Sequence, residues 1–91
     1  MKVLLTGAFG NLGTRTIESL LDQGHEVRCL DLETKKNRKR ARWFGNRIET
    51  AWGDVRRPSD LEAAVRDREV VLHLAFIIDV LGWSRVSRLE Q

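Results

Sequence analysis

The sequence predicts an α/β fold built on a parallel sheet. Four short apolar runs of strand length alternate with segments of helical period along the 91 residues. The first run ends in TGAFGNLG, a turn with glycines at positions 7, 10 and 13, and this turn leads directly into the first helical segment. Strands that alternate with crossover segments in this way predict parallel neighbours joined by right-handed connections.

The first two expected elements are a strand at 2–6 and a helix that begins at about Leu12. The strand, KVLLT, is a continuous apolar run, which is typical of a strand buried on both faces. Gly24 stands where a left-handed cap would end the helix. The residues expected on the buried face of this helix are Leu12, Thr16, Ile17, Leu20 and Leu21.

The middle of the chain holds two further expected strands around an ambiguous basic segment. Residues 26–31 (EVRCLD) have strand alternation and stop on an acid, and residues 48–52 (IETAW) have strand period. Residues 33–47 predict either a helix or a long loop, with Trp43 and Phe44 anchoring its far end onto the sheet.

The last expected elements are a helix and a fourth strand. The sequence SDLE matches a capping box in which Ser59 accepts a hydrogen bond from the amide three residues later, and a helix through Arg66 follows. The fourth strand is expected at 69–75 (EVVLHLA), with His73 as a packed core residue and not an acid or base. Residues 76–91 form a tail with an apolar start.

Length and composition indicate one small domain, covering 1–91, of soluble globular composition. Cys29 is the single cysteine, so an internal disulfide is excluded and a reducing, cytoplasmic location is expected. The longest apolar stretch is too short for a membrane helix, which needs about 20 residues. No group of residues suggests a metal site.

The positive charge of the chain is local. Although the net charge is +3, one segment holds seven cations and no acid, so the remainder is net negative. A local charge of this kind could bind an anionic partner, and Trp43 and Phe44 beside it could stack on nucleic-acid bases. The segment lacks a recognisable nucleic-acid module, so we do not expect nucleic acid as a partner from the sequence. The seven cations are Lys35, Lys36, Arg38, Lys39, Arg40, Arg42 and Arg47.

The glycine turn has the spacing of a dinucleotide-binding turn. Gly7 would permit the tight turn, Gly10 would let a pyrophosphate approach the backbone, and Gly13 would let the helix pack closely on the strand. Asp31, 18 residues after Gly13, stands at the end of the second strand, where a carboxylate accepts hydrogen bonds from ribose hydroxyls. The amides at the start of the helix would face the phosphates.

TGAFGNLG resembles the Thr-Gly-x-x-Gly-x-x-Gly fingerprint of the extended short-chain dehydrogenases/reductases, the NAD-dependent epimerase/dehydratase group, many of which act on nucleotide sugars. WGDVRRPSDLEAAV is similar to the family's turn before its third helix, and VVLHLAF is similar to its fourth-strand motif. The resemblance implies the N-terminal part of an NAD(P)-binding Rossmann domain. Its sheet would be the middle of three layers, with four strands in the order 3-2-1-4.

The resemblance also implies the cofactor-binding residues. Asp31, with Leu32 beside it, would bind the adenosine ribose, and Asp54 and Val55 would bind the adenine. Asp54 could equally be a turn residue after Gly53. The pyrophosphate would lie against Thr6, Gly7, Phe9, Gly10, Asn11, Leu12 and Gly13, and the wall beside the nicotinamide ribose would be Leu74, Ala75 and Phe76, the last of which replaces the family's usual alanine.

Asp31 favours NAD over NADP, because a carboxylate would repel the additional phosphate of NADP. Lys35 and Lys36 lie several residues beyond the strand end, and a charge run of this kind is usually a solvated face. We therefore expect NAD as the cofactor.

The family's catalytic pair, Tyr-x-x-x-Lys, is absent, because the chain has no tyrosine. No catalytic residue is therefore assigned, and the expected function is that of the dinucleotide-binding half of an epimerase/dehydratase-like oxidoreductase, catalytically incomplete as it stands. Two alternatives stay open: a nucleotide-binding or regulatory module without turnover, and a basic protein that binds an anionic partner. In the complete fold the fourth strand pairs with a fifth, so here we expect either self-association through this strand and the tail or a chain cut from a longer protein.

Overall fold

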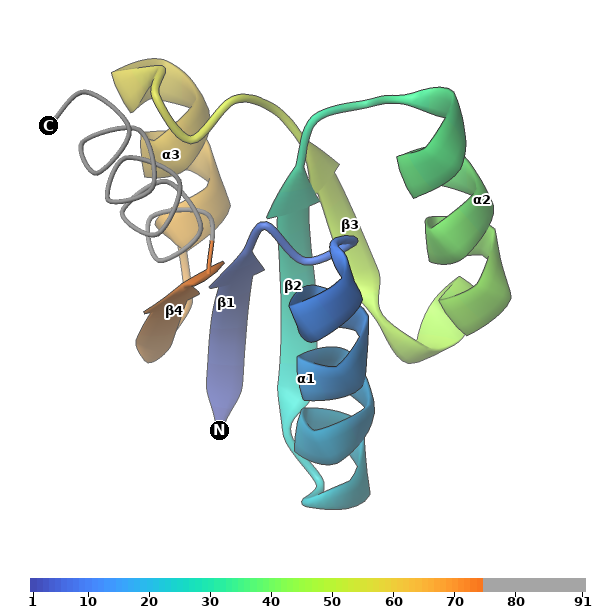
Figure 1. The fold of residues 1–91 in the computed structure, drawn as a ribbon. Helices are drawn as coiled ribbons and strands as arrows, with labels where there is room; N and C mark the ends of the chain where they lie inside the picture. Colours follow the sequence, from blue (N-terminus) through green and yellow to red (C-terminus); the bar gives the residue numbers. More distant parts are fainter. Residues whose placement is uncertain (75–91) are drawn as a thin grey trace, which may run out of the picture.

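The structure, a computed structural model, describes residues 1–74. Four parallel strands form one sheet in the order β3-β2-β1-β4, as predicted (Figure 1). The predicted tail, including Ala75 and Phe76, lies outside the described residues. The elements are β1 (Lys2–Thr6), α1 (Asn11–Asp22), β2 (Glu26–Asp31), α2 (Lys35–Phe44), a 3-10 helix η1 (Gly45–Arg47), β3 (Glu49–Trp52), α3 (Pro58–Val65) and β4 (Val70–His73).

The sheet is the middle of three layers. Helices α1 and α2 cover one face, and α3 covers the other (Figure 1). Adjacent residues of β1 therefore serve different cores: Leu5 belongs to the cluster under α1 and α2, and Leu4 to the smaller cluster under α3. Both side chains are fully buried, which agrees with the expectation for a strand covered on both faces.

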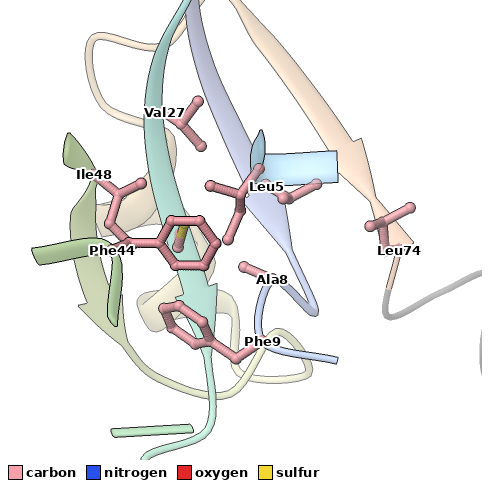
Figure 2. Packing of buried hydrophobic residues seen from close by; sticks show 9 residues of the cluster. Leu5, Ala8, Phe9, Val27, Phe44, Ile48 and Leu74 are labelled. Atoms are coloured by element: carbon pink, nitrogen blue, oxygen red, sulfur yellow. The ribbon is translucent and has the colours of Figure 1, made fainter. Parts of the chain in front are cut away.

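The larger core joins the glycine turn to α2. Figure 2 shows Phe9 from the turn and Phe44 from α2 in the same apolar cluster as Leu5 and Val27. Phe9 is fully buried, and its ring lies 5.6 Å from that of Trp52 on β3. The packing of Phe9 therefore fixes the turn against the sheet. None of the described helices is long and apolar enough to cross a bilayer.

Helix α1 begins at Asn11 and ends at Asp22, with Gly24 at a φ of +83° as the predicted left-handed cap. Ile17 is fully buried, but Leu12 is half-exposed, so its assignment to the buried face is wrong. Leu12 lies in the first turn of α1 beside the exposed Asn11, whereas the next residue, Gly13, is the buried one in this turn.

The basic segment is a helix and not a loop. Thr34 caps α2, because its Oγ1 accepts a hydrogen bond of 3.1 Å from the amide of Asn37. Phe44 is buried and anchors the segment as expected, but Trp43 is 75% exposed, so its predicted anchoring role is wrong. The physical reason is helical geometry: consecutive residues point about 100° apart, and Phe44 occupies the inward position.

Two local expectations near α3 and β4 are also wrong. Helix α3 begins with Pro58 and has Arg57 as its N-cap without a side-chain cap, so Ser59 lies inside the helix and forms no capping box. Proline is well suited to the first helical position, where no amide bond is lost. His73 is exposed and not packed in the core, and its Nδ1 lies 3.1 Å from Oγ1 of Thr6.

Candidate functional site

The candidate site lies at the carboxyl edge of the sheet, where β1, β2 and β3 end beside one another. An open pocket of about 290 Å³ is located there. In open parallel sheets, ligands bind outside the carboxyl ends of the strands. The pocket is lined by Gly7, Leu30, Asp31, Leu32, Gly53, Asp54, Val55 and Arg56.

The glycine turn connects β1 to α1 with two positions that require glycine. Gly7 has a φ of +64°, a left-handed conformation that other residues rarely adopt, and its amide donates 3.0 Å to the carbonyl of Leu30. A Cβ at Gly13 would lie 2.3 Å from the carbonyl oxygen of Ala8, so the helix can approach the turn only without a side chain there. These are the roles that the sequence predicted for Gly7 and Gly13.

Gly10 is the N-cap of α1, and its backbone does not itself require glycine. Its φ of −74° and ψ of 176° are open to any residue. No side chain caps α1, so the amides of its first turn are left for another acceptor. An uncapped helix start behind a glycine without a side chain can accept an anion.

Asp31 at the end of β2 joins the turn to the pocket. Its Oδ2 accepts a hydrogen bond of 3.0 Å from the amide of Phe9, and its Oδ1 accepts one of 2.8 Å from the amide of Leu32. A carboxylate oxygen has a second lone pair, so both oxygens can still accept from a ligand diol. The carboxylate is thus oriented by two backbone amides at the wall of the pocket.

Arg40 of α2 reaches the same turn, which the sequence did not reveal. Its Nη1 donates to the carbonyl of Phe9, and its Nη2 donates 3.1 Å to Oδ1 of Asn11. The Phe9 peptide is therefore held on both sides, by Asp31 at its N–H and by Arg40 at its C=O. Seven cations in the basic segment were equivalent in the sequence, and only the register of α2 selects Arg40.

Asp54 both lines the pocket and shapes the turn after β3. Its Oδ1 accepts from the amide of Arg56 at 2.9 Å, and its Oδ2 forms an ion pair of 2.8 Å with the Arg56 guanidinium. These hydrogen bonds lower the pKa of Asp54 to about 2. The amide of Asp54 donates 2.9 Å to Oδ2 of Asp60. The Asp54 carboxylate thus stabilises the turn after Gly53, which was the alternative expected from the sequence. The residue also lines the pocket.

The remaining expected residues divide between the site and the core. Thr6 is fully buried and its Oγ1 contacts His73, while Leu74 is buried in the larger core cluster. The side chain of Phe9 is also in the core, so only its peptide group belongs to the site. Arg56 and Gly53 line the pocket although the sequence had not assigned them to it.

The residues present fit a dinucleotide. The pocket at the strand ends has an oriented carboxylate suited to a ribose diol, and beside it lie an uncapped helix start and a turn that excludes side chains at Gly13.

Cys29, on β2 near this edge, is not a candidate nucleophile. Burial, and to a smaller extent the nearby charge of Asp31, raises the pKa of the Cys29 thiol to about 12. The thiol therefore does not form the nucleophilic thiolate at neutral pH.

Comparisons with known proteins agree with this geometry. Residues 4–90 match the model of the 3-beta hydroxysteroid dehydrogenase/isomerase family. The chain is 31% identical over 86 residues to a 3-beta-hydroxysteroid dehydrogenase of Mycolicibacterium neoaurum, a match that covers 94% of this chain and 22% of that protein. It is 35% identical over 96 residues to a UDP-glucose 4-epimerase of Klebsiella pneumoniae, covering 99% of this chain and 68% of that protein.

A solved structure shows the same arrangement of elements. It is a short-chain dehydrogenase/reductase superfamily protein from Agrobacterium tumefaciens with bound NAD, 29% identical, with a TM-score of 0.62. The likeness covers 79% of this chain and 19% of that chain. This chain therefore corresponds to about a fifth of the length of that protein and of the hydroxysteroid dehydrogenase.

Proposed function

The chain belongs to the 3-beta hydroxysteroid dehydrogenase/isomerase family, and we propose that it binds NAD at the carboxyl edge of its sheet as the dinucleotide-binding part of an oxidoreductase. The observation that carries this proposal is the position of Asp31. Its carboxylate lines the pocket while two backbone amides orient it, one of them from the glycine turn. A ribose diol that bridges this carboxylate would bring the adjoining pyrophosphate toward Gly10 and the uncapped start of α1.

The charges around the pocket favour NAD over NADP. Asp31 would repel a phosphate on the adenosine ribose. Arg56 is the cation among the described residues that line the pocket, and its guanidinium is ion-paired with Asp54. The guanidinium of Arg40 donates to the Phe9 carbonyl and to Asn11, so these donors are not available to a phosphate on the ribose. Among the described residues that line this pocket, the one cation is thus already paired with a carboxylate.

The proposed reaction of the whole protein is the oxidation of a secondary alcohol, for which bound NAD would supply the hydride acceptor. Two substrate classes are supported by different relatives: a 3β-hydroxysteroid by the family match, and a nucleotide sugar by the UDP-glucose 4-epimerase of Klebsiella pneumoniae. The 91 residues contain no tyrosine, so they lack the phenol of a Tyr-x-x-x-Lys pair. We propose that this chain alone binds the dinucleotide without turnover.

Calorimetric titration with NAD, NADP and AMP tests the proposal. We expect NAD to bind at least about ten-fold more tightly than NADP, and AMP to bind measurably because the ribose site is intact. Gly10→Val should abolish the binding of NAD and weaken that of AMP to a smaller extent, since NAD places two phosphates against the turn and AMP only one. The φ and ψ of Gly10 are open to valine, so the substitution introduces no backbone strain.

The matched control is Ser19→Val, an exposed position farther along α1. It should bind both ligands as the original chain does. Binding of NADP as tight as that of NAD would contradict the cofactor assignment, and unchanged NAD binding by Gly10→Val would contradict the site itself.

A further inference from the structure

The outward side of α2 presents cations and a tryptophan that the dinucleotide site does not use. We define the α2 outer face as Lys36, Lys39, Arg42 and Trp43. Lys36, Lys39 and Trp43 are spaced at i, i+3 and i+7, so they share one side of the helix. With Arg40 at its inner edge, this face lines an open groove of about 660 Å³.

Trp43 is the unusual member of the face. It is 75% exposed, whereas its neighbour Phe44 is 3% exposed and packed in the core. From the sequence, both aromatic residues were expected to anchor the segment onto the sheet. Only Phe44 does so, and a large exposed indole among cations is left without a structural role.

The charges of the face have no ion-pair partner in the part of the chain that the structure describes. The segment 35–47 contains no acid, and the nearby Glu33 pairs with Arg38 at 3.8 Å. Within residues 1–74, no ion pair involves Lys36, Lys39 or Arg42. The face therefore presents three unpaired cations around one exposed aromatic ring.

We propose that the α2 outer face binds single-stranded nucleic acid, with a base stacked on Trp43 and the phosphates held by Lys36, Lys39 and Arg42. Grooves that bind single strands combine cations along the backbone with aromatic side chains on which bases stack. Helix α2 has 10 residues and is thus about 15 Å long, so the face would span only a few nucleotides.

A lipid surface fits this face less well. Amphipathic helices that bind membranes bury a broad apolar face. In α2 the other apolar residues, Ala41 and Phe44, pack against the core, and the outer face offers Trp43 alone. A protein partner also fits less well, because interfaces between proteins are depleted in lysine.

This site is separate from the proposed dinucleotide site. None of Lys36, Lys39, Arg42 and Trp43 lines the pocket at the strand ends. The binding of a single strand should therefore be unaffected by saturating NAD. The two proposals can hold or fail independently.

Fluorescence anisotropy of the whole chain with labelled 12-nucleotide oligouridylate and oligothymidylate, at 50 and 200 mM salt, tests the proposal. Trp43→Ala should weaken binding by about ten-fold or more, and Trp43→Phe should restore most of it because a phenyl ring still stacks. The exposure of Trp43 means that these variants should keep their circular dichroism spectrum. Lys36→Ala and Lys39→Ala should each lower the slope of log affinity against log salt by about 0.7.

Arg15→Ala is the matched control, since it removes an exposed cation from α1. It should change neither affinity nor salt slope. The proposal is overturned if Trp43→Ala binds as the original chain does, if neither oligonucleotide binds at 50 mM salt, or if polyglutamate or phosphatidylserine vesicles bind more tightly than the oligonucleotides. Stronger binding of the uridylate or of the thymidylate would support the proposal and identify RNA or DNA as the preferred strand.

Discussion

The backbone amide of Phe9 donates a hydrogen bond of 3.0 Å to Oδ2 of Asp31, and this bond joins the glycine turn to the end of β2. Asp31 is therefore both a proposed ligand of the ribose and a support for the turn. We expect Asp31→Ala to weaken NAD binding by about ten-fold or more, because it removes the acceptor of the diol and loosens the turn. Calorimetry measures the loss. Asp22→Ala, at the exposed end of α1, is the control and should leave affinity unchanged.

Gly13→Ala should destabilise the chain by about 3 kcal/mol or more, because overpacking against a fixed backbone forces the helix and turn apart. The added Cβ would lie 2.3 Å from the Ala8 carbonyl oxygen and 2.4 Å from that of Gly7. Urea unfolding followed by circular dichroism measures the effect. Glu18→Ala, exposed on the same helix, should stay within about 0.5 kcal/mol of the original stability. Equal stability of the two variants would show that the turn is not as rigid as we infer.

Arg40→Ala should reduce NAD affinity by about five-fold or more, because the turn loses the donors to the Phe9 carbonyl and to Asn11. Arg40→Lys should recover only part of the loss, since an ammonium group does not reproduce the planar fork of the guanidinium. Arg42→Ala removes a cation from the same helix without contact to the turn, and titration with NAD should not detect it. A similar loss of NAD affinity in Arg42→Ala would mean that the loss in Arg40→Ala comes from the change in overall charge and not from the contacts of Arg40 with the turn.

Cys29 predicts a decrease in stability at alkaline pH. Burial, with a smaller contribution from the Asp31 charge, raises the pKa of the Cys29 thiol from its ordinary value of 9.0 to about 12 in the folded chain. As the pH rises, the unfolded chain therefore loses the thiol proton before the folded chain does. The contribution of the protonated thiol to the free energy of unfolding is fully present below pH 9 and is lost as the pH rises toward 12, by about 1.4 kcal/mol per pH unit. Urea titrations at several pH values from 8 to 10.5 give the free energy of unfolding at each pH, and this free energy should fall less steeply with pH in Cys29→Ala than in the original chain. An identical dependence on pH in the two chains would mean that the thiol has the same pKa in the folded and unfolded states.

Strand β4 is at the edge of the described sheet, and Val71 on it is 38% exposed. The expected self-association through this strand stays a prediction. Val71→Lys should shift the chain toward monomer, because a charge on an edge strand opposes pairing with a second edge. Light scattering over a range of concentrations measures this, with the exposed Ala63→Lys as control. A chain that is monomeric throughout before substitution would remove the basis for the prediction.

The family resemblance and the fold class were predicted correctly from the sequence, because each rests on a local pattern. The bounds of β1 and β2 agree with the apolar runs, and the left-handed Gly24 agrees with its position after the helical segment. The structural roles of Gly7 and Gly13 could be predicted because their spacing relative to a strand and a helix is itself the signal, whereas the role of Gly10 beside a pyrophosphate stays a prediction.

The errors concern residues whose environment depends on tertiary packing. Trp43 and Phe44 are adjacent in the sequence, and only the angle at which α2 docks decides that Phe44 is buried and Trp43 exposed. His73 lies in an apolar strand, yet it is exposed beside Thr6. Arg40 could not be distinguished from its neighbours, since its partners are 29 and 31 residues away.

The double attachment of the Phe9 peptide would link the proposed NAD affinity to the cooperative unfolding of the domain. Its N–H is held from β2 and its C=O from α2, so opening of either element frees the turn. Hydrogen exchange of the Phe9 amide should then report the sub-global opening of this half of the domain and not local fraying of the loop. Selection for tight dinucleotide binding would then also select for sequences in which α2 stays docked on the sheet. The residues of α2 that hold it there would be constrained by ligand binding in the same way as the glycines of the turn.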